Sequence, residues 1–110
     1  MFKMDKAKTG STDKHDRPLS PPVDVYENDA ELLLVADVPG VAQGGAEVTL
    51  EQDRLIVEAK GGARQYRREL IVPPSIDPEK ISASIKAGVL TVHLPKRAQY
   101  QPRQIEVRSA

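Results

Sequence analysis

The residues of this chain best suited to chemistry are its two histidines and a nearby serine. His15 lies in a polar stretch and His93 in an alternating apolar segment, so neither has a second histidine at zinc-site spacing. Ser84 and His93 would make a nucleophile and base only if the fold joined them, which the sequence leaves open but does not suggest. We therefore expect no catalytic residue and no metal site, and we interpret His93 as an exposed or half-buried strand residue.

Phosphate-binding chemistry has no better support. The dipeptides Gly44–Gly45 and Gly61–Gly62 are each followed by alanine, but neither lies in a GxxxxGK or GxGxxG motif that opens a helix. The acidic residues are scattered along expected strand surfaces rather than paired. The sequence therefore predicts a protein that is not an enzyme and binds no cofactor.

The C-terminal tail carries an apolar pair in a polar setting. In an extended chain Ile105 and Val107 point the same way, with Glu106 between them pointing the other way. Nothing nearby in the sequence covers them, so we expect them to fill a hole elsewhere. The alternatives are that they fold back on their own domain or remain free.

Length and composition set the class of protein. The 110 residues suggest one domain, and the absence of cysteine excludes disulfides and fits a reducing cytoplasm. The longest apolar run, residues 32–36, is too short to span a bilayer, and the first ten residues lack the apolar region of a secretory signal. Aromatic residues are only 4%, which argues against a stacking platform for single-stranded nucleic acid. We expect a cytoplasmic protein without membrane contact.

Charge is balanced overall but unevenly distributed. The net charge is zero, with +2 in residues 1–22, +3 in residues 96–110 and the balancing negative charge between them. Basic arms on an acidic body suit weak nucleic-acid binding or docking on other copies of the chain. The density of basic residues is too low to favour nucleic acid, so we expect no such partner.

The elements that must position these residues are strands. Short segments of period-two alternation are separated by glycine or proline, and no segment has the period of an amphipathic helix, which is typical of an all-β sandwich. The expected strands are residues 23–26, 31–38, 47–51, 55–60, 66–72, 81–86 and 89–95. Residues 31–38 are apolar on both faces, so this strand should be central or covered.

Three regions follow from this reading. Residues 1–21 form a flexible arm, residues 22–95 the sandwich and residues 96–110 a tail. Within the sandwich, Ala87–Gly88 is a two-residue break between the last two strands, and Gly88 supplies the positive φ that such a turn needs. Because alanine tolerates positive φ badly, we expect a turn in which only Gly88 has it.

Several motifs, in order, resemble those of the α-crystallin domain of small heat-shock proteins. DVPGV (residues 37–41) is similar to the family's D-φ-P-G-φ turn, where φ is apolar, and YRRELIVP (66–73) to its aromatic-x-Arg strand. ASIKAGVL (83–90) resembles its A-x-x-x-n-G-v-L signature, and VLTVHLPK its last long strand. Ile105-Glu106-Val107 resembles its C-terminal I-x-I/V motif. The resemblance covers residues 22–107.

The resemblance implies an immunoglobulin-like sandwich of about seven antiparallel strands. It implies a stress-response chaperone that holds unfolding client proteins without ATP and assembles from dimers into oligomers. It also implies that the tail residues Ile105 and Val107 fill a groove on a neighbouring subunit. The groove residues would be Val48, Leu50, Ile81, Ala83 and Ile85.

One departure from the family changes the expected dimer. Bacterial and plant members have an extra strand between the strands that match residues 55–60 and 66–72, and that strand crosses to the partner. Only about five residues connect them here, too few for a strand and its return. We therefore expect the strand 66–72 to be a sheet edge that pairs antiparallel with its twin, as in animal members, or a solvated edge protected by charge. The expected edge residues are Tyr66, Arg67, Arg68, Glu69 and Leu70.

Two rival functions stay open at this point. The p23-type co-chaperones share this sandwich without the tail motif, so the chain would then be a protein-interaction module without holdase oligomers. The short connection and an arm whose apolar content is only Phe2, two methionines and Leu19 favour that alternative. The tail pair and the AGVL motif favour the holdase.

Overall fold

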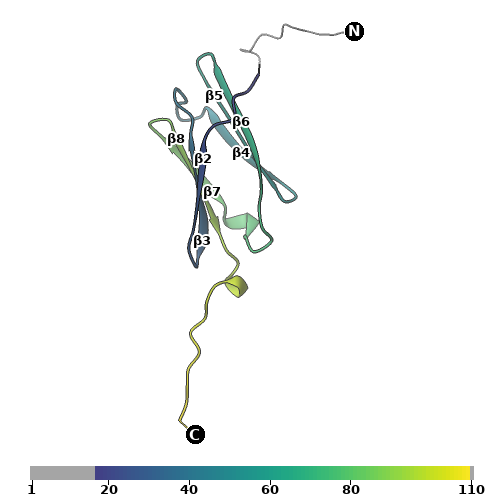
Figure 1. The fold of residues 1–110 in the computed structure, drawn as a ribbon, viewed down its shortest axis with the longest axis vertical. Helices are drawn as coiled ribbons and strands as arrows, with labels where there is room; N and C mark the ends of the chain where they lie inside the picture. The colour runs from purple at the N-terminus through teal and green to yellow at the C-terminus, as the bar shows by residue number, and fades with distance from the viewer. Residues whose placement is uncertain (1–16, 110) are drawn as a thin grey trace.

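The structure, a computed structural model, describes residues 17–109 as a body of strands followed by an extended tail (Figure 1). Most of the expected N-terminal arm, residues 1–16 with His15 and Phe2, lies outside the described residues, as does Ala110. The elements are β2 (Val23–Glu27), β3 (Glu31–Asp37), β4 (Ala46–Glu51), β5 (Arg54–Gly61), β6 (Arg64–Ile71), η2 (Pro78–Lys80), β7 (Ser82–Lys86), β8 (Val89–Pro95) and η3 (Ala98–Tyr100).

The strands form two antiparallel sheets that face each other (Figure 1). One sheet has the order β2-β3-β8-β7 and the other β4-β5-β6. This arrangement confirms the predicted all-β sandwich of about seven antiparallel strands. The edge strands are β2 and β7 in the first sheet and β4 and β6 in the second.

The period-two pattern places the core as predicted. Strand β3 lies between β2 and β8, with Leu34 and Ala36 buried and Leu33 and Val35 half-buried on its other face. Strand β8 likewise buries every second residue. Side chains from both sheets meet in one apolar cluster, and dispersion and the hydrophobic effect both favour this packing. Its members are Leu34, Ala36, Val38, Val41, Leu55, Val57, Ala59, Tyr66, Val72, Ile76, Leu90, Val92 and Leu94.

The turn between β7 and β8 corrects one expectation. Ala87 has φ +53° and Gly88 has φ +76°, so both turn residues are left-handed and the prediction that only Gly88 would be was wrong. A two-residue hairpin favours the type I′ turn because its twist matches that of the strands, and this outweighs the strain at one alanine. Gly88 also packs closely, since a Cβ there would lie 3.2 Å from the Cα of Pro39.

The hairpin between β5 and β6 is shorter than the sequence suggested. Only residues 62 and 63 separate the two strands, so the described chain has no additional strand at this place. Gly61 packs against Gly40 so closely that a Cβ would overlap the backbone there. The hydroxyl of Tyr66 donates to the carbonyl oxygen of Pro39 at 2.9 Å. The hairpin is therefore fixed to the loop that follows β3.

The Ala87 finding gives a prediction about stability. Ala87→Asn should raise the free energy of unfolding by about 1 kcal/mol, because asparagine adopts the left-handed conformation far more readily than alanine. Gly88→Ala should lower it by about 1–2 kcal/mol, since it adds both left-handed strain and a close contact with Pro39. Urea unfolding of both variants beside the parent measures this. An Ala87→Asn protein no more stable than the parent would show that the turn is not left-handed at residue 87.

Candidate functional site

The root of the tail is anchored where the chain leaves β8. The backbone N–H groups of Lys96 and Arg97 donate to the carbonyl oxygens of Ala30 and Ser75 at 2.8 and 2.7 Å. The turn η3 follows, and the side-chain amide of Gln101 donates to the carbonyl oxygen of Lys96 at 2.7 Å. These contacts direct the tail away from the sandwich (Figure 1).

The two apolar tail residues are exposed. The side chains of Ile105 and Val107 lie on an extended segment and are 76% and 91% exposed. They do not fold back on their own sandwich. An exposed isoleucine and valine two positions apart on an extended segment point to the same side of it.

A cavity of about 400 Å³ lies between the edge strands β4 and β7. Three of the predicted groove residues, Val48, Ala83 and Ile85, line it together, and Leu90 of β8 forms part of its lining. Val48 and Ile85 also pack against the core. The edges of β4 and β7 flank the cavity, so an extended segment entering it has backbone groups to pair with.

The other two predicted groove residues lie elsewhere. Leu50 lines a separate cavity of about 150 Å³ with Ile76 and Pro78. Ile81 follows η2 and packs half-buried against the core. The structure therefore does not join Leu50 and Ile81 to the cavity that holds the other three.

The predicted dimer edge divides between the inside and the outside of the sandwich. Tyr66, Arg68 and Leu70 point toward the core side, where Tyr66 is buried and the other two are half-buried. Only Arg67 and Glu69 of the five predicted residues are exposed. The surface available to a partner is thus mainly the backbone of β6 with these two charged side chains.

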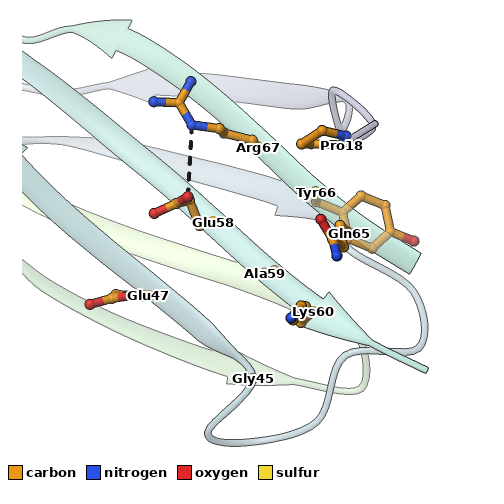
Figure 2. A pocket seen from close by; sticks show the side chains of 9 residues that line it. All are labelled: Pro18, Gly45, Glu47, Glu58, Ala59, Lys60, Gln65, Tyr66 and Arg67. Atoms are coloured by element: carbon orange, nitrogen blue, oxygen red, sulfur yellow. Dashed lines mark ion pairs between the residues drawn. The ribbon is translucent and has the colours of Figure 1, made fainter. Parts of the chain in front are cut away.

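The residue that sequence reasoning missed is Leu19, which pairs with the edge of β6. Its N–H donates to the carbonyl oxygen of Gln65 at 2.7 Å, and its carbonyl accepts from the N–H of Arg67 at 2.8 Å, in a parallel bridge with Tyr66. Figure 2 shows the preceding Pro18 beside Tyr66 and Arg67 at one rim of a surface pocket of about 230 Å³. The only local signal was a single leucine among prolines.

Charged side chains form a ladder on the outer face of the sheet that contains β6. Arg67 contacts Glu69 at 2.6 Å and Glu58 at 3.7 Å, the latter drawn in Figure 2, and Arg54 contacts Glu69 and Glu51 at 2.8 and 2.9 Å. The hydrogen bond from Arg67, with the charges of both arginines, lowers the pKa of the Glu69 carboxyl. Glu69 therefore stays ionised between two cations.

The residues first considered for catalysis are not arranged for it. The Nδ1 atom of His93 lies 3.1 Å from a carboxylate oxygen of Glu31, and Ser82 rather than Ser84 is its cross-strand neighbour. Within residues 17–109 no group of His, Asp and Glu side chains is placed to hold a metal ion. None of the helices in that range is long and apolar enough to cross a membrane.

Comparison with known sequences identifies the relatives of this chain. Residues 24–108 match the Hsp20/alpha crystallin family. A probable 15 kDa heat shock protein from Leptospira interrogans is 36% identical, with 84% of this chain and 82% of that protein covered. Spore protein SP21 from Stigmatella aurantiaca is 32% identical, with 82% and 63% covered.

Among solved structures, a small heat-shock protein from Xylella fastidiosa has a TM-score of 0.68 and 28% identity. It covers 84% of this chain and all of its own. The rat alpha crystallin domain, at 20% identity and a TM-score of 0.55, shares the fold.

The Glu69 contacts predict a pH-dependent contribution to stability. Because the folded state lowers the pKa of Glu69, its contribution is present above the ordinary carboxyl pKa of 4.5 and is lost as pH falls through the lower folded value. Glu69→Gln should therefore be less stable than the parent at pH 7 and equally stable in acid. Urea unfolding from pH 7 downward tests this, with Glu47→Gln on the same sheet face as the control. A difference that persists unchanged in acid would contradict it.

Proposed function

The chain belongs to the Hsp20/alpha crystallin family of small heat-shock chaperones, which are not enzymes, and on that premise we propose that it is an ATP-independent holdase. It binds unfolding proteins in the cytoplasm and assembles through its tail and the edge of β6. In this proposal residues 22–95 form the sandwich domain, and residues 1–21 and 96–110 are the N-terminal arm and the C-terminal tail.

The observation that carries the proposal is that the same chain has an exposed apolar tail pair and a cavity of suitable lining. Ile105 and Val107 are exposed on a tail held away from the body, and a cavity of about 400 Å³ lies between β4 and β7. We assign the tail of a second copy to this cavity. Val48, Ala83 and Ile85 supply the apolar contacts, with Leu50 and Ile81 of the predicted groove outside the tail's immediate site.

The energetics favour a reversible contact. Burying an isoleucine and a valine contributes about 1.5–3 kcal/mol each. Ordering three tail residues costs about 1–2 kcal/mol each in backbone entropy. A few strand-type hydrogen bonds add about 1 kcal/mol each, so one docked tail is only weakly favourable. Stable assembly therefore needs many tails docked at once.

The edge of β6 is the proposed dimer contact. The two-residue turn after β5 leaves no chain for a strand that crosses to a partner. Arg67 and Glu69 are exposed beside this edge, so an antiparallel twin brings Arg67 of one copy opposite Glu69 of the other. Opposite charges across such a pair stabilise it modestly and fix its register.

Unfolding clients have the same chemistry as the tail. An apolar extended segment of a client fits the cavity between β4 and β7 and competes there with Ile105 and Val107. Release of the weakly held tails on warming exposes these cavities when clients begin to unfold.

The first prediction from this proposal concerns client protection. A heat-labile client heated with this protein and no nucleotide should scatter less light than the client alone, because its exposed apolar segments are sequestered. An equal mass of serum albumin controls for nonspecific crowding. Equal aggregation with and without the protein would contradict the holdase assignment, and a monomeric protein without protection would indicate a p23-like interaction module.

The second prediction concerns the tail. Replacing Ile105 and Val107 by serine should abolish species larger than the dimer, since the tail then loses nearly all the apolar area that it buries. The matched control replaces Gln104 and Glu106 by serine, on the other side of the same extended segment. Light scattering coupled to size exclusion gives the mass. If the two double variants have the same mass distribution as the parent, the tail does not hold the assembly together.

A further inference from the structure

The edge of β6 that the dimer needs is already partly occupied within the chain. Leu19 takes two backbone groups there, the carbonyl of Gln65 and the N–H of Arg67. A guanidinium nitrogen of Arg68 also donates to the carbonyl oxygen of Pro21 at 3.0 Å, which holds the same segment against β6. We call residues 17–21 the guard segment.

The guard covers half of the edge and leaves the other half open. In an antiparallel ladder alternate residues direct their backbone groups to opposite sides, so Gln65, Arg67, Glu69 and Ile71 face away from β5. The guard pairs with the first two of these residues, through the carbonyl of Gln65 and the N–H of Arg67. The outward groups of Glu69 and Ile71 take no partner within residues 17–109, and the Ile71 side chain is 69% exposed.

Prolines limit how far the guard pairs. In the parallel register of Leu19, the next donor along the segment would be residue 21, but Pro21 has no N–H. The bridge therefore stops at two backbone hydrogen bonds. Leu19 is 48% exposed, whereas Pro21 is fully buried. The guard is therefore anchored at Pro21, and its pairing with the edge through Leu19 is the weaker contact.

A twin pairing with the full edge requires the groups that the guard holds. If the two-fold axis passes beside Arg68, Arg67 pairs with Glu69 of the second copy and Gln65 pairs with its Ile71. This arrangement uses the N–H of Arg67 and the carbonyl of Gln65, both of which bind Leu19. One edge cannot serve both partners.

We propose that the β6 edge at Gln65 and Arg67 is a shared binding surface for which the guard segment of the same chain and the β6 strand of a second copy compete. The guard protects the edge in the monomer and is displaced on dimerisation. This inference rests on the edge dimer of the proposed function. It adds that residues 17–21 oppose the dimer.

The test compares two proline variants in full-length protein. Leu19→Pro removes the donor to Gln65, whereas Ser20→Pro adds the same residue at a neighbour whose N–H makes no hydrogen bond to the described residues. Both carry serine at positions 105 and 107, so that only the dimer forms. A lost hydrogen bond weakens each guard about fivefold, and dimerisation opens two guards. The dimer constant should therefore tighten by more than twofold and up to about 25-fold for Leu19→Pro, and stay within twofold for Ser20→Pro.

Two further variants show that the gain acts through the edge. Adding Glu69→Pro to Leu19→Pro should abolish the gain in dimer affinity, because it removes an N–H that would pair with the second copy. This N–H faces away from β5, so the pairing of β6 with β5 is kept, and edge strands tolerate such prolines. Glu69→Gln keeps that N–H and should keep most of the gain. Leu19→Gly is the milder variant if Leu19→Pro fails to fold, and should shift the constant in the same direction.

Sedimentation equilibrium gives the dimer constants, and hydrogen exchange of the dilute monomer reports the guard directly. The Arg67 amide should exchange more slowly than the Glu69 amide in the parent, and this protection should be lost in Leu19→Pro. Equal dimer constants for Leu19→Pro, Ser20→Pro and the parent would overturn the competition while leaving the edge dimer intact. A protected Arg67 amide with every variant monomeric would overturn the edge dimer and the competition with it.

Discussion

The unpaired backbone groups of strand edges are the constraint on which this molecule depends. A sandwich of two open sheets has four edge strands, here β2, β7, β4 and β6, and each exposes donors and acceptors that another strand can join. The chain does not close its sheets into a barrel. It leaves a cavity between β4 and β7 and covers only half of β6 with Leu19. In the proposed function, assembly, protection against aggregation and client binding all depend on which segment pairs with these edges.

The sequence predicted the parts of the fold that one repeated pattern determines. Alternation in β3 and β8 places Leu34, Ala36 and Leu90 in the core because a strand exposes successive residues to opposite faces. The turn at Ala87 was mispredicted because the local preference of alanine opposes the twist of a two-residue hairpin, and the hairpin prevails. Leu19 has no periodic neighbours, and its role depends on Gln65 and Arg67, more than forty positions away in the chain.

The candidate site was only partly predictable for a related reason. Alternation indicates which face of a strand is apolar, and the family resemblance placed Val48 and Ile85 beside one groove. Both residues line the same cavity between the two sheets. Alternation does not show what else enters the space between them. Beside Leu50, the chain between β6 and β7 brings in Ile76 and Pro78, which line a separate cavity with it. A crossing segment of this kind is a tertiary feature, and no local pattern in β4 or β7 reveals it.

The sandwich and its two terminal segments are held by different interactions. The contacts of the segments can therefore open while the sandwich stays folded. The body is held by thirteen buried apolar residues in one cluster and by two fully registered sheets. The guard has two backbone hydrogen bonds because Pro21 cannot supply a third, and the tail has two apolar side chains. In the proposed assembly, the docked tail nearly balances its ordering entropy, so we expect warming to release it before the sandwich unfolds. In an oligomer that needs many such contacts, a small loss of free energy in each contact becomes a large loss in the stability of the assembly. The strand edges and cavities that clients would meet remain folded.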